Sequence, residues 1–275
     1  MILIGDVGGT KAEWMVLENG VSRTFKTLGV NLVHEKLTEY LKKVATSIQP
    51  YSEAEQVYLY FAGLLDVPRQ RRNVLNEIKK SFPKAKIKIE NDLLGAARGA
   101  YQTSPGWIGI LGTGANFAYY NGKVITQRIP SLGYILGDEG SGAAFGKKLV
   151  IDFARQKLPL DLENEFRKAY KLDEGTLISK VYDPVGSKAF LASFSFFLQT
   201  HLSHPYCHQL VYQAFIEHFK AVAGNYNPGT LVSYTGSIAY QFSTVLEAAA
   251  SSVGIAIHSI MPTPIEGLAN YHKLA

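Results

Sequence analysis

Short apolar segments alternate with longer amphipathic segments through the N-terminal part of the chain. Runs in which apolar side chains dominate or alternate with polar ones predict strands, whereas apolar residues spaced three and four apart predict helices. An Asn-Gly pair at residues 19–20 joins the second and third strands and is typical of a two-residue hairpin turn. The pattern predicts strands at 2–7, 12–17, 22–27, 56–61 and 86–90, and helices at 32–48, 69–82 and 92–101.

The same order of elements begins again in the later part of the chain. Residues 108–133 (IGILGTGANFAYYNGKVITQRIPSLG) can be aligned with residues 4–29 (IGDVGGTKAEWMVLENGVSRTFKTLG). Both segments open with Ile-Gly and close with Leu-Gly, and both carry a glycine turn after the first strand and an Asn-Gly turn after the second. Beyond this repeat the pattern predicts helices at 139–156, 162–170, 186–200, 206–223, 238–252 and 265–274, and strands at 230–234 and 255–260.

A repeat of this kind predicts two α/β domains of the same plan that face each other across a cleft. The segment TSPGW at residues 103–107 is the best boundary between them, because proline and glycine favour a linker. We therefore expect an N-terminal domain at 1–105 and a C-terminal domain at 106–275, with the last helix able to pack back on the N-terminal domain. The apolar stretch at 190–198 suits a core or a dimer interface equally well.

Each predicted domain carries a glycine turn after its first strand. The first turn contains Gly8, Gly9 and Thr10, and the second contains Gly112, Thr113 and Gly114. Because glycine has no Cβ, such a turn lets backbone N–H groups approach an anion, although a plain hairpin explains a single turn as well. Two turns at corresponding places favour a clamp on a polyphosphate. The sequence contains neither the Walker motif nor the dinucleotide-binding motif GxGxxG.

Asp6 stands two residues before the first glycine turn. Phosphates would repel a carboxylate beside them unless a cation intervened, and proteins commonly hold Mg²⁺ through one or two carboxylates, waters and phosphate oxygens. Asp6 is therefore the candidate Mg²⁺ ligand. The alternative is an aspartate that caps the turn through its own backbone.

Composition and charge narrow the classes of partner. The 275 residues carry 28 basic and 23 acidic side chains, and the basic run at 69–80 fits the exposed face of a helix better than a nucleic-acid surface. The single cysteine, Cys207, excludes an internal disulfide and suits a reducing compartment. No apolar run approaches the roughly 18 residues that a membrane span needs. We expect a cytoplasmic protein with no nucleic-acid or membrane partner.

Four short motifs give the chain a family resemblance. They are DVGGTK at 6–11, GTGAN at 112–116, LGDEGSG at 136–142 and TGSIA at 235–239. In this order they resemble the sugar kinase, heat-shock ATPase and actin superfamily, and more narrowly its N-acetylglucosamine kinase branch, grouped with the BadF/BadG-type ATPases. The resemblance implies an α/β fold of two ribonuclease-H-like (actin-like ATPase) domains and a site for ATP with Mg²⁺.

The resemblance also implies roles for particular residues. Asp92 matches the catalytic aspartate of the kinases, although an aspartate at the start of a helix is also a common N-cap. The sugar contacts match Asn31, Asn116 and Asp138; a turn is the alternative role for Asn31, and a helix cap is the alternative for Asp138. The nucleotide contacts match Asp6, Gly8, Gly9, Thr10, Lys11, Gly112, Thr113, Gly114, Gly236 and Ser237.

The activity that the resemblance implies is transfer of a phosphate from ATP to the 6-hydroxyl of an amino sugar. N-acetylglucosamine is the first substrate to test, with N-acetylmuramic acid and glucosamine as alternatives, and we expect a homodimer. An ATPase activator of the BadF type would need more cysteines than Cys207 for its iron–sulfur cluster, and a sugar sensor would not need both Asp6 and Asp92. A metal site at 201–208 is disfavoured, because Pro205 fits the first turn of a helix.

Overall fold

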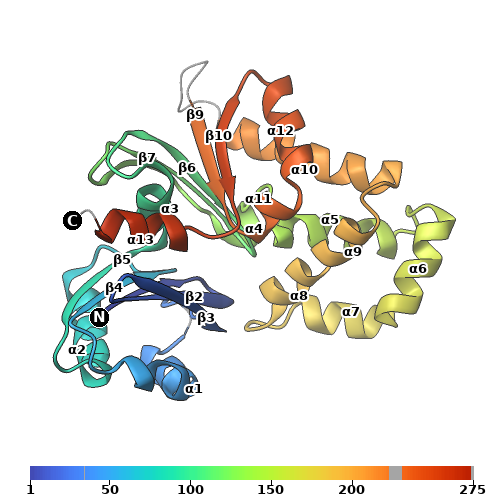
Figure 1. Ribbon diagram of the computed structural model, residues 1–275. Coiled ribbons are helices and arrows are strands. Elements are labelled where there is room, and N and C mark those ends of the chain that lie inside the picture. Colours follow the sequence, from blue (N-terminus) through green and yellow to red (C-terminus); the bar gives the residue numbers. More distant parts are fainter. Residues whose placement is uncertain (34, 223–230, 274–275) are drawn as a thin grey trace. The chain divides into compact units, whose positions relative to one another are not determined.

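The computed structural model describes residues 1–33, 35–222 and 231–273 of the chain (Figure 1). These residues form two compact units. The first contains Met1–Gly106, Tyr119–Thr126 and the C-terminal segment that begins at Thr263, and the second contains Trp107–Ala118 and Gln127–Pro262. Three of the predicted elements, at 206–223, 230–234 and 265–274, each include one terminal residue that lies outside the described part.

The first unit is built on a five-stranded sheet with the order β3-β2-β1-β4-β5. Its elements are β1 (Ile2–Val7), β2 (Lys11–Glu18), β3 (Val21–Leu28), α1 (Leu37–Ile48), the 3₁₀ helix η1 (Gln49–Tyr51), β4 (Gln56–Phe61), α2 (Pro68–Ser81), β5 (Lys86–Asn91), α3 (Asp92–Tyr101) and α13 (Ile265–Lys273). β2 runs antiparallel to β1 and β3, whereas β1, β4 and β5 run parallel. The carboxyl ends of β1, β4 and β5 therefore lie at the same edge of the sheet.

The two faces of this sheet pack against different helices. Successive residues of a strand point to opposite faces, so each face has its own set of buried side chains. Leu3 and Phe61 belong to a core that includes residues of α1 and α2. Ile4 and Tyr60, on the opposite face, pack with Leu268 of α13. The last helix of the described chain is thus part of the core of the first unit.

The second unit repeats the plan of the first. Its sheet has the order β10-β9-β6-β7-β8, formed by β6 (Gly106–Leu111), β7 (Ala115–Tyr120), β8 (Ile125–Ile129), β9 (Leu231–Thr235) and β10 (Ala256–Met261). β6, β9 and β10 run parallel, as do β1, β4 and β5 at the corresponding places. The matching strand orders confirm the expected α/β fold of two ribonuclease-H-like, actin-like ATPase domains.

Several helices of the second unit differ from the prediction. Its helices are α4 (Gly133–Leu136), α5 (Gly142–Ala154), α6 (Leu160–Tyr170), α7 (Glu174–Val181), α8 (Ser187–Ser193), α9 (Ser195–Thr200), α10 (Pro205–Val222), α11 (Ser237–Gln241) and α12 (Ser243–Ser252). α7 was not predicted, and the single helix expected at 186–200 is divided into α8 and α9. Pro205 begins α10, as expected. The stretch at 190–198 contributes Leu191, Phe194 and Phe197 to the core, whereas Phe196 is exposed. No helix in the described ranges is both long and apolar enough to cross a membrane.

The first predicted helix begins later than expected, at Leu37 instead of residue 32. The side-chain oxygen of Asn31 accepts a hydrogen bond from the backbone N–H of Val33 at 3.0 Å. The carbonyl oxygen of Asn31 accepts a second one from the N–H of Glu35 at 2.9 Å. The side-chain bond competes with the helix, and the bond to Glu35 closes a single turn that ends at Lys36, whose extended backbone caps α1. Residue 34, inside the predicted helix, lies outside the described part.

Helices α3 and α13 approach so closely that glycine is needed where they cross. A Cβ on Gly267 of α13 would collide with the carbonyl oxygen of Gly99 in α3, and a Cβ on Gly99 would lie 2.7 Å from the Cβ of Pro264. The side-chain amide of Gln102 also donates a hydrogen bond to the carbonyl of Gly267 at 3.0 Å. This close approach fixes α13 against the first unit.

We expect Gly267→Ala to destabilise the protein by about 1–3 kcal/mol, because an added methyl group overpacks the crossing. The loss should appear although alanine is intrinsically the better helix former by about 1 kcal/mol. Urea unfolding would measure it. The matched control is Gly175→Ala in α7, where the nearest atom to an added Cβ is 3.5 Å away and the site is exposed, so stability should rise slightly. An equal gain in both variants would contradict the role of Gly267.

Candidate functional site

The residues expected at the site fall into two sets, one in each compact unit. The first set is Asp6, Gly8, Gly9, Thr10, Lys11, Asn31 and Asp92. The second set is Gly112, Thr113, Gly114, Asn116, Asp138, Gly236 and Ser237. Most of them stand at or just beyond the end of a strand, where a βα or ββ connection begins.

Asp6 lies near the carboxyl end of β1 in an acidic row of the first sheet. Cross-strand pairing places Glu13 of β2 on one side of Asp6 and Tyr60 of β4 on the other, with Glu90 of β5 beyond Tyr60. Directly paired residues share a face of a sheet, so the three carboxylates lie on the face that packs against α13. Glu90 is paired with the guanidinium of Arg71 at 3.2 Å. Glu13 is paired with the ammonium of Lys26 at 3.7 Å, so Asp6 is the acid of this row to consider for a bound cation.

Burial, then the nearby carboxylates of Asp92 and Glu13, raise the pKa of Asp6 to about 7, while the ammonium of Lys11 opposes the shift. The surroundings of Asp6 thus disfavour its negative charge. A cation would relieve this repulsion. The donor set, one or two carboxylates beside a phosphate-binding turn, fits Mg²⁺.

No group of three or more His, Cys, Asp or Glu side chains within residues 1–33, 35–222 and 231–273 is arranged to hold a metal ion. An ion held by Asp6 would thus take its remaining ligands from phosphate oxygens and water, which is the usual arrangement for Mg²⁺.

Asp92 is the first residue of α3 and not its N-cap. The cap is Asn91, whose side-chain oxygen accepts a hydrogen bond from the backbone N–H of Leu94 at 2.9 Å. One carboxylate oxygen of Asp92 accepts a hydrogen bond from the N–H of Leu93, also at 2.9 Å. The interpretation of Asp92 as the helix cap is therefore wrong, because the preceding residue has the extended backbone that a cap requires.

The first glycine turn is held against the segment that follows β3. The N–H of Gly29 donates to the carbonyl of Thr10 at 3.0 Å, and that of Val30 donates to the carbonyl of Gly8 at 2.9 Å. These bonds bring Asn31 beside the turn, where a Cβ on Gly9 would lie 3.6 Å from the Cβ of Asn31. Asn31 does form a local turn, so its turn role and its predicted sugar contact are both compatible with the structure.

The second glycine turn connects β6 to β7. The N–H of Gly112 donates to the carbonyl of Gly114 at 3.0 Å, and the first amides of α5 donate to the carbonyls of Gly112 and Thr113 at 2.9 and 3.2 Å. A Cβ on Gly112 would meet no atom within 4 Å, so the fold itself does not require glycine there. The open space beside Gly112 is room that a ligand such as a phosphate could use.

Asp138 is buried in the loop between α4 and α5. Its Oδ1 atom accepts hydrogen bonds from the N–H of Ala115 at 3.2 Å and from the hydroxyl of Ser131 at 3.1 Å. Its Oδ2 atom lies 2.8 Å from the ammonium of Lys188. The structure thus brings Asp138 to the start of β7, one residue before Asn116. Asp138 is not a helix cap, because Ser141 caps α5 by accepting from the N–H of Ala144 at 3.2 Å.

Lys188 and His218 are residues of this region that the sequence analysis missed. His218 of α10 bonds the hydroxyl of Tyr234 through Nε2 at 3.0 Å, and it also has a hydrogen bond with the backbone of Glu139. Burial lowers the pKa of His218 to about 4, so the ring that supports the Asp138 loop is neutral at physiological pH. Both residues reach the loop from helices distant in sequence, and no local motif marks them.

Gly236, one of the predicted nucleotide contacts, connects β9 to α11. Gly236 has φ of +112°, and a Cβ there would collide with the carbonyl oxygen of Leu111 at the end of β6. Its N–H donates to the carbonyl of Met261 at 3.1 Å. Glycine is therefore required by the fold at this position, and Ser237 follows as the first residue of α11.

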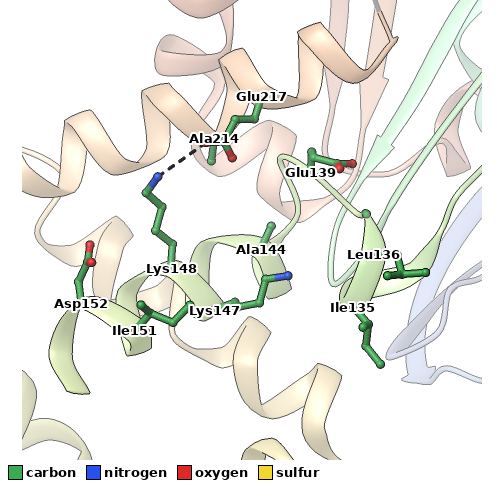
Figure 2. Close-up of a pocket in the computed structure, with 11 residues that line it drawn as sticks. Ile135, Leu136, Glu139, Ala144, Lys147, Lys148, Ile151, Asp152, Ala214 and Glu217 are labelled. Carbon is green, nitrogen blue, oxygen red and sulfur yellow. Dashed lines mark ion pairs between the residues drawn. The ribbon is translucent and has the colours of Figure 1, made fainter. Parts of the chain in front are cut away.

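A pocket of about 430 Å³ lies on another side of the Asp138 loop (Figure 2). Glu139 and Leu136 line it together with residues of α5 and α10, whereas Asp138 does not. An ion pair between Lys148 and Glu217, 3.7 Å apart, crosses its edge. The adjacent acids Asp138 and Glu139 therefore have different surroundings, and only Asp138 is joined to the start of β7.

Comparisons with known proteins identify close relatives among solved structures. No protein-family model and no curated protein sequence matches the chain. A candidate N-acetylglucosamine kinase from Porphyromonas gingivalis is 32% identical, covers 99% of this chain and 98% of its own, and has a TM-score of 0.92.

More distant structures share the fold. A candidate N-acetylglucosamine kinase from Chromobacterium violaceum is 16% identical, covers 98% of each chain and has a TM-score of 0.76. A ROK-family glucokinase from Streptomyces griseus, solved with glucose and AMPPNP, is 15% identical, covers 100% of this chain and 98% of its own, and has a TM-score of 0.60. Because the identity to the Porphyromonas gingivalis protein extends over nearly the whole length of both chains, this chain belongs to the N-acetylglucosamine kinase family, within the sugar kinase, heat-shock ATPase and actin superfamily.

Proposed function

We propose that the chain transfers the terminal phosphate of ATP to the 6-hydroxyl of an N-acetylated amino sugar, with N-acetylglucosamine as the first substrate. The observation that carries the proposal is that Asp6, near the end of β1, and Asp92, just after β5, stand at the same edge of one parallel sheet, with the first glycine turn directly after β1. Phosphoryl transfer to a hydroxyl uses a carboxylate at the acceptor and positioned charge at the phosphates. The likeness to the candidate kinase from Porphyromonas gingivalis supports the class of sugar.

Asp92 is the proton acceptor for the attacking hydroxyl. Asn91 caps α3, and the carboxylate of Asp92, the first helical residue, accepts a hydrogen bond from the N–H of Leu93 at 2.9 Å. The start of a helix also holds the carboxylate in a defined place, and the positive end of the helix dipole stabilises its ionised form. These two features suit a residue that must be ionised and correctly placed when the sugar binds.

The phosphates of ATP are bound through the glycine turns and through Mg²⁺ held at Asp6. When bound, Mg²⁺ would neutralise part of the charge on the phosphates. The backbone of each turn offers N–H groups, and Lys11 adds a positive charge next to Asp6. The proposed nucleotide contacts are Asp6, Gly8, Gly9, Thr10, Lys11, Gly112, Thr113, Gly114, Gly236 and Ser237.

The sugar is bound through Asn31, Asn116 and Asp138. Amide and carboxylate groups can donate to or accept from neighbouring sugar hydroxyls, and a hydroxyl-binding site of this kind rejects ligands that leave its polar groups unpaired. N-acetylmuramic acid and glucosamine are the alternative substrates. A homodimer and a cytoplasmic location are further parts of the proposal, which includes no nucleic-acid or membrane partner.

Purified protein should release ADP from Mg-ATP rapidly only when an N-acetylated hexosamine is added. A coupled assay with N-acetylglucosamine, N-acetylmuramic acid, glucosamine and glucose would measure this release, and mass spectrometry would identify the sugar phosphate and its position. ADP release that is equal with and without every sugar would favour an ATPase switch. Sugar binding without any ADP release would favour a sensor.

Replacing the two acids should produce different defects. Asp92→Asn removes the proton acceptor and should lower kcat by about 10² to 10⁴, the usual effect of losing a general base. Asp6→Asn should mainly raise the KM for Mg-ATP, and excess Mg²⁺ should restore part of the activity. Steady-state kinetics at several Mg²⁺ concentrations would separate the two, with Asp66→Asn as the control, because that side chain is 89% exposed. Nearly normal turnover in Asp92→Asn would exclude Asp92 as the base.

Gly112→Ala should leave the fold intact and weaken ATP binding. An added methyl group meets no protein atom within 4 Å, but it would occupy the space proposed for a phosphate. The KM for ATP should rise by about tenfold or more, which corresponds to roughly 1.4 kcal/mol of binding energy.

The matched variant for this prediction is Gly114→Ala, in the same turn. Its Cβ would lie 2.8 Å from Oδ2 of Asp138, so we expect a loss of thermal stability in Gly114→Ala and none in Gly112→Ala. Unchanged ATP kinetics in Gly112→Ala would exclude this turn as a phosphate contact.

A further inference from the structure

The ion pair between Asp138 and Lys188 joins a buried carboxylate to a partly exposed ammonium. The atoms Oδ2 of Asp138 and Nζ of Lys188 are 2.8 Å apart, and the two side chains are 1% and 36% exposed, respectively. The other oxygen of Asp138 already accepts from Ala115 and Ser131. An ammonium carries three N–H donors, so Lys188 can bind a ligand while it stays paired with Asp138.

The packing of α8 on α5 fixes the place of Lys188. A Cβ on Gly146 of α5 would collide with the carbonyl oxygen of Leu191 in α8, so the two helices are in close contact. Ser187, next to Lys188, is 2% exposed and donates a hydrogen bond from its hydroxyl to the carbonyl of Val181. The backbone of Lys188 is therefore fixed by the contacts of Ser187 before it and of Leu191 after it, and these contacts restrict the direction of its side chain.

The ammonium of Lys188 lies against the second glycine turn. A Cβ on Gly114 would collide with the Nζ atom of Lys188, and Gly114 is followed directly by Ala115, which donates to Asp138. Asn116 is the next residue along β7. The ammonium thus lies beside two of the three residues proposed to bind the sugar, and it is the positive charge nearest to Asp138.

We propose that Lys188 determines which amino sugar the site accepts. Its ammonium donates hydrogen bonds to oxygen atoms of a neutral N-acetylated sugar and repels the protonated amine of glucosamine. This inference rests on the proposed function, because it takes Asn116 and Asp138 as sugar contacts. Two like charges a few ångströms apart near a protein surface interact strongly enough to change a ratio of affinities by about tenfold or more.

Removal of the ammonium and removal of the carboxylate should change the selectivity between glucosamine and N-acetylglucosamine in opposite directions. Lys188→Met leaves the carboxylate of Asp138 as the charge nearest the sugar, so the affinity for glucosamine relative to N-acetylglucosamine should rise by about tenfold or more. Asp138→Asn leaves the ammonium without its counterion, so the same ratio should fall. The double variant Lys188→Met/Asp138→Asn removes both charges and should give a ratio between those of the single variants.

Isothermal titration calorimetry with glucosamine and with N-acetylglucosamine would measure both affinities. The titration is done at low salt, which leaves the repulsion between Lys188 and glucosamine unscreened. A pH of about 6 keeps the amine of glucosamine protonated, since an amine such as an α-amino group titrates near pH 8. The double variant also covers the case in which Lys188→Met fails to fold, because it buries no unpaired charge. Lys148→Met is the matched control: its ammonium pairs with Glu217 in the same unit at 3.7 Å, and its loss should leave the ratio unchanged.

The role of Lys188 would be overturned if the ratio of the affinities for glucosamine and N-acetylglucosamine stayed the same in the variants at 188 and 138. It would also be overturned if that ratio changed equally in Lys148→Met. ADP release by the wild-type protein tests the proposed function separately. If the wild-type protein phosphorylates N-acetylglucosamine but the ratio does not change, only the role of Lys188 fails. If the ratio changes without phosphate transfer to any sugar, the kinase proposal fails and the role of Lys188 stands. Failure of the wild-type protein to bind either sugar would overturn both.

Discussion

The parallel pairing of β1 with β4 and of β4 with β5 is the constraint on which the first unit of this protein depends. Parallel strands end at the same edge of a sheet, so residues far apart in sequence meet there. Asp6 near the end of β1 and Asp92 just after β5 are for this reason at the same edge, with β4 between their strands. The glycine turn after β1 and the Asn31 segment after β3 are then held beside them by backbone hydrogen bonds. A change in the register of β4 or β5 would move Asp92 away from Asp6 and the glycine turn that follows it.

The buried carboxylates Asp138 and Asp6, one in each unit, have different surroundings. Asp138 is surrounded by an ammonium, an N–H group and a hydroxyl, so its charge is balanced within the protein. Asp6 has other carboxylates near it, and its charge is disfavoured by its surroundings. A balanced carboxylate gains little from an added cation, whereas a disfavoured one gains much. This contrast explains why, of the two acids, Asp6 is the one to expect next to a metal ion.

Much of the fold could be predicted from the sequence because its signals are local. The alternation of side chains, the Asn-Gly turns and the repeated glycine turns predict the strands, and the repeat predicts two sheets of one plan, which their matching strand orders confirm. Helix boundaries were harder. Asn31 delays the start of α1 through the hydrogen bond that its side chain accepts from Val33, and Asn91 caps α3 although Asp92 is an equally suitable residue type. Lys188 and His218 could not be predicted, because only the packing of α8 and α10 brings them to the Asp138 loop.

The position of α13 has a consequence for synthesis on the ribosome. The face of the first sheet that carries Ile4 and Tyr60 is covered by residues of α13, which is made after the whole of the second unit. During translation this apolar face stays uncovered, and the first sheet lacks part of its core, until α13 emerges from the ribosome. The second unit, whose residues are complete by Pro262, has all of its own core before that moment. The order of folding in the nascent chain is therefore expected to reverse the order of the units in the sequence, and the waiting sheet is the part that a chaperone would need to protect.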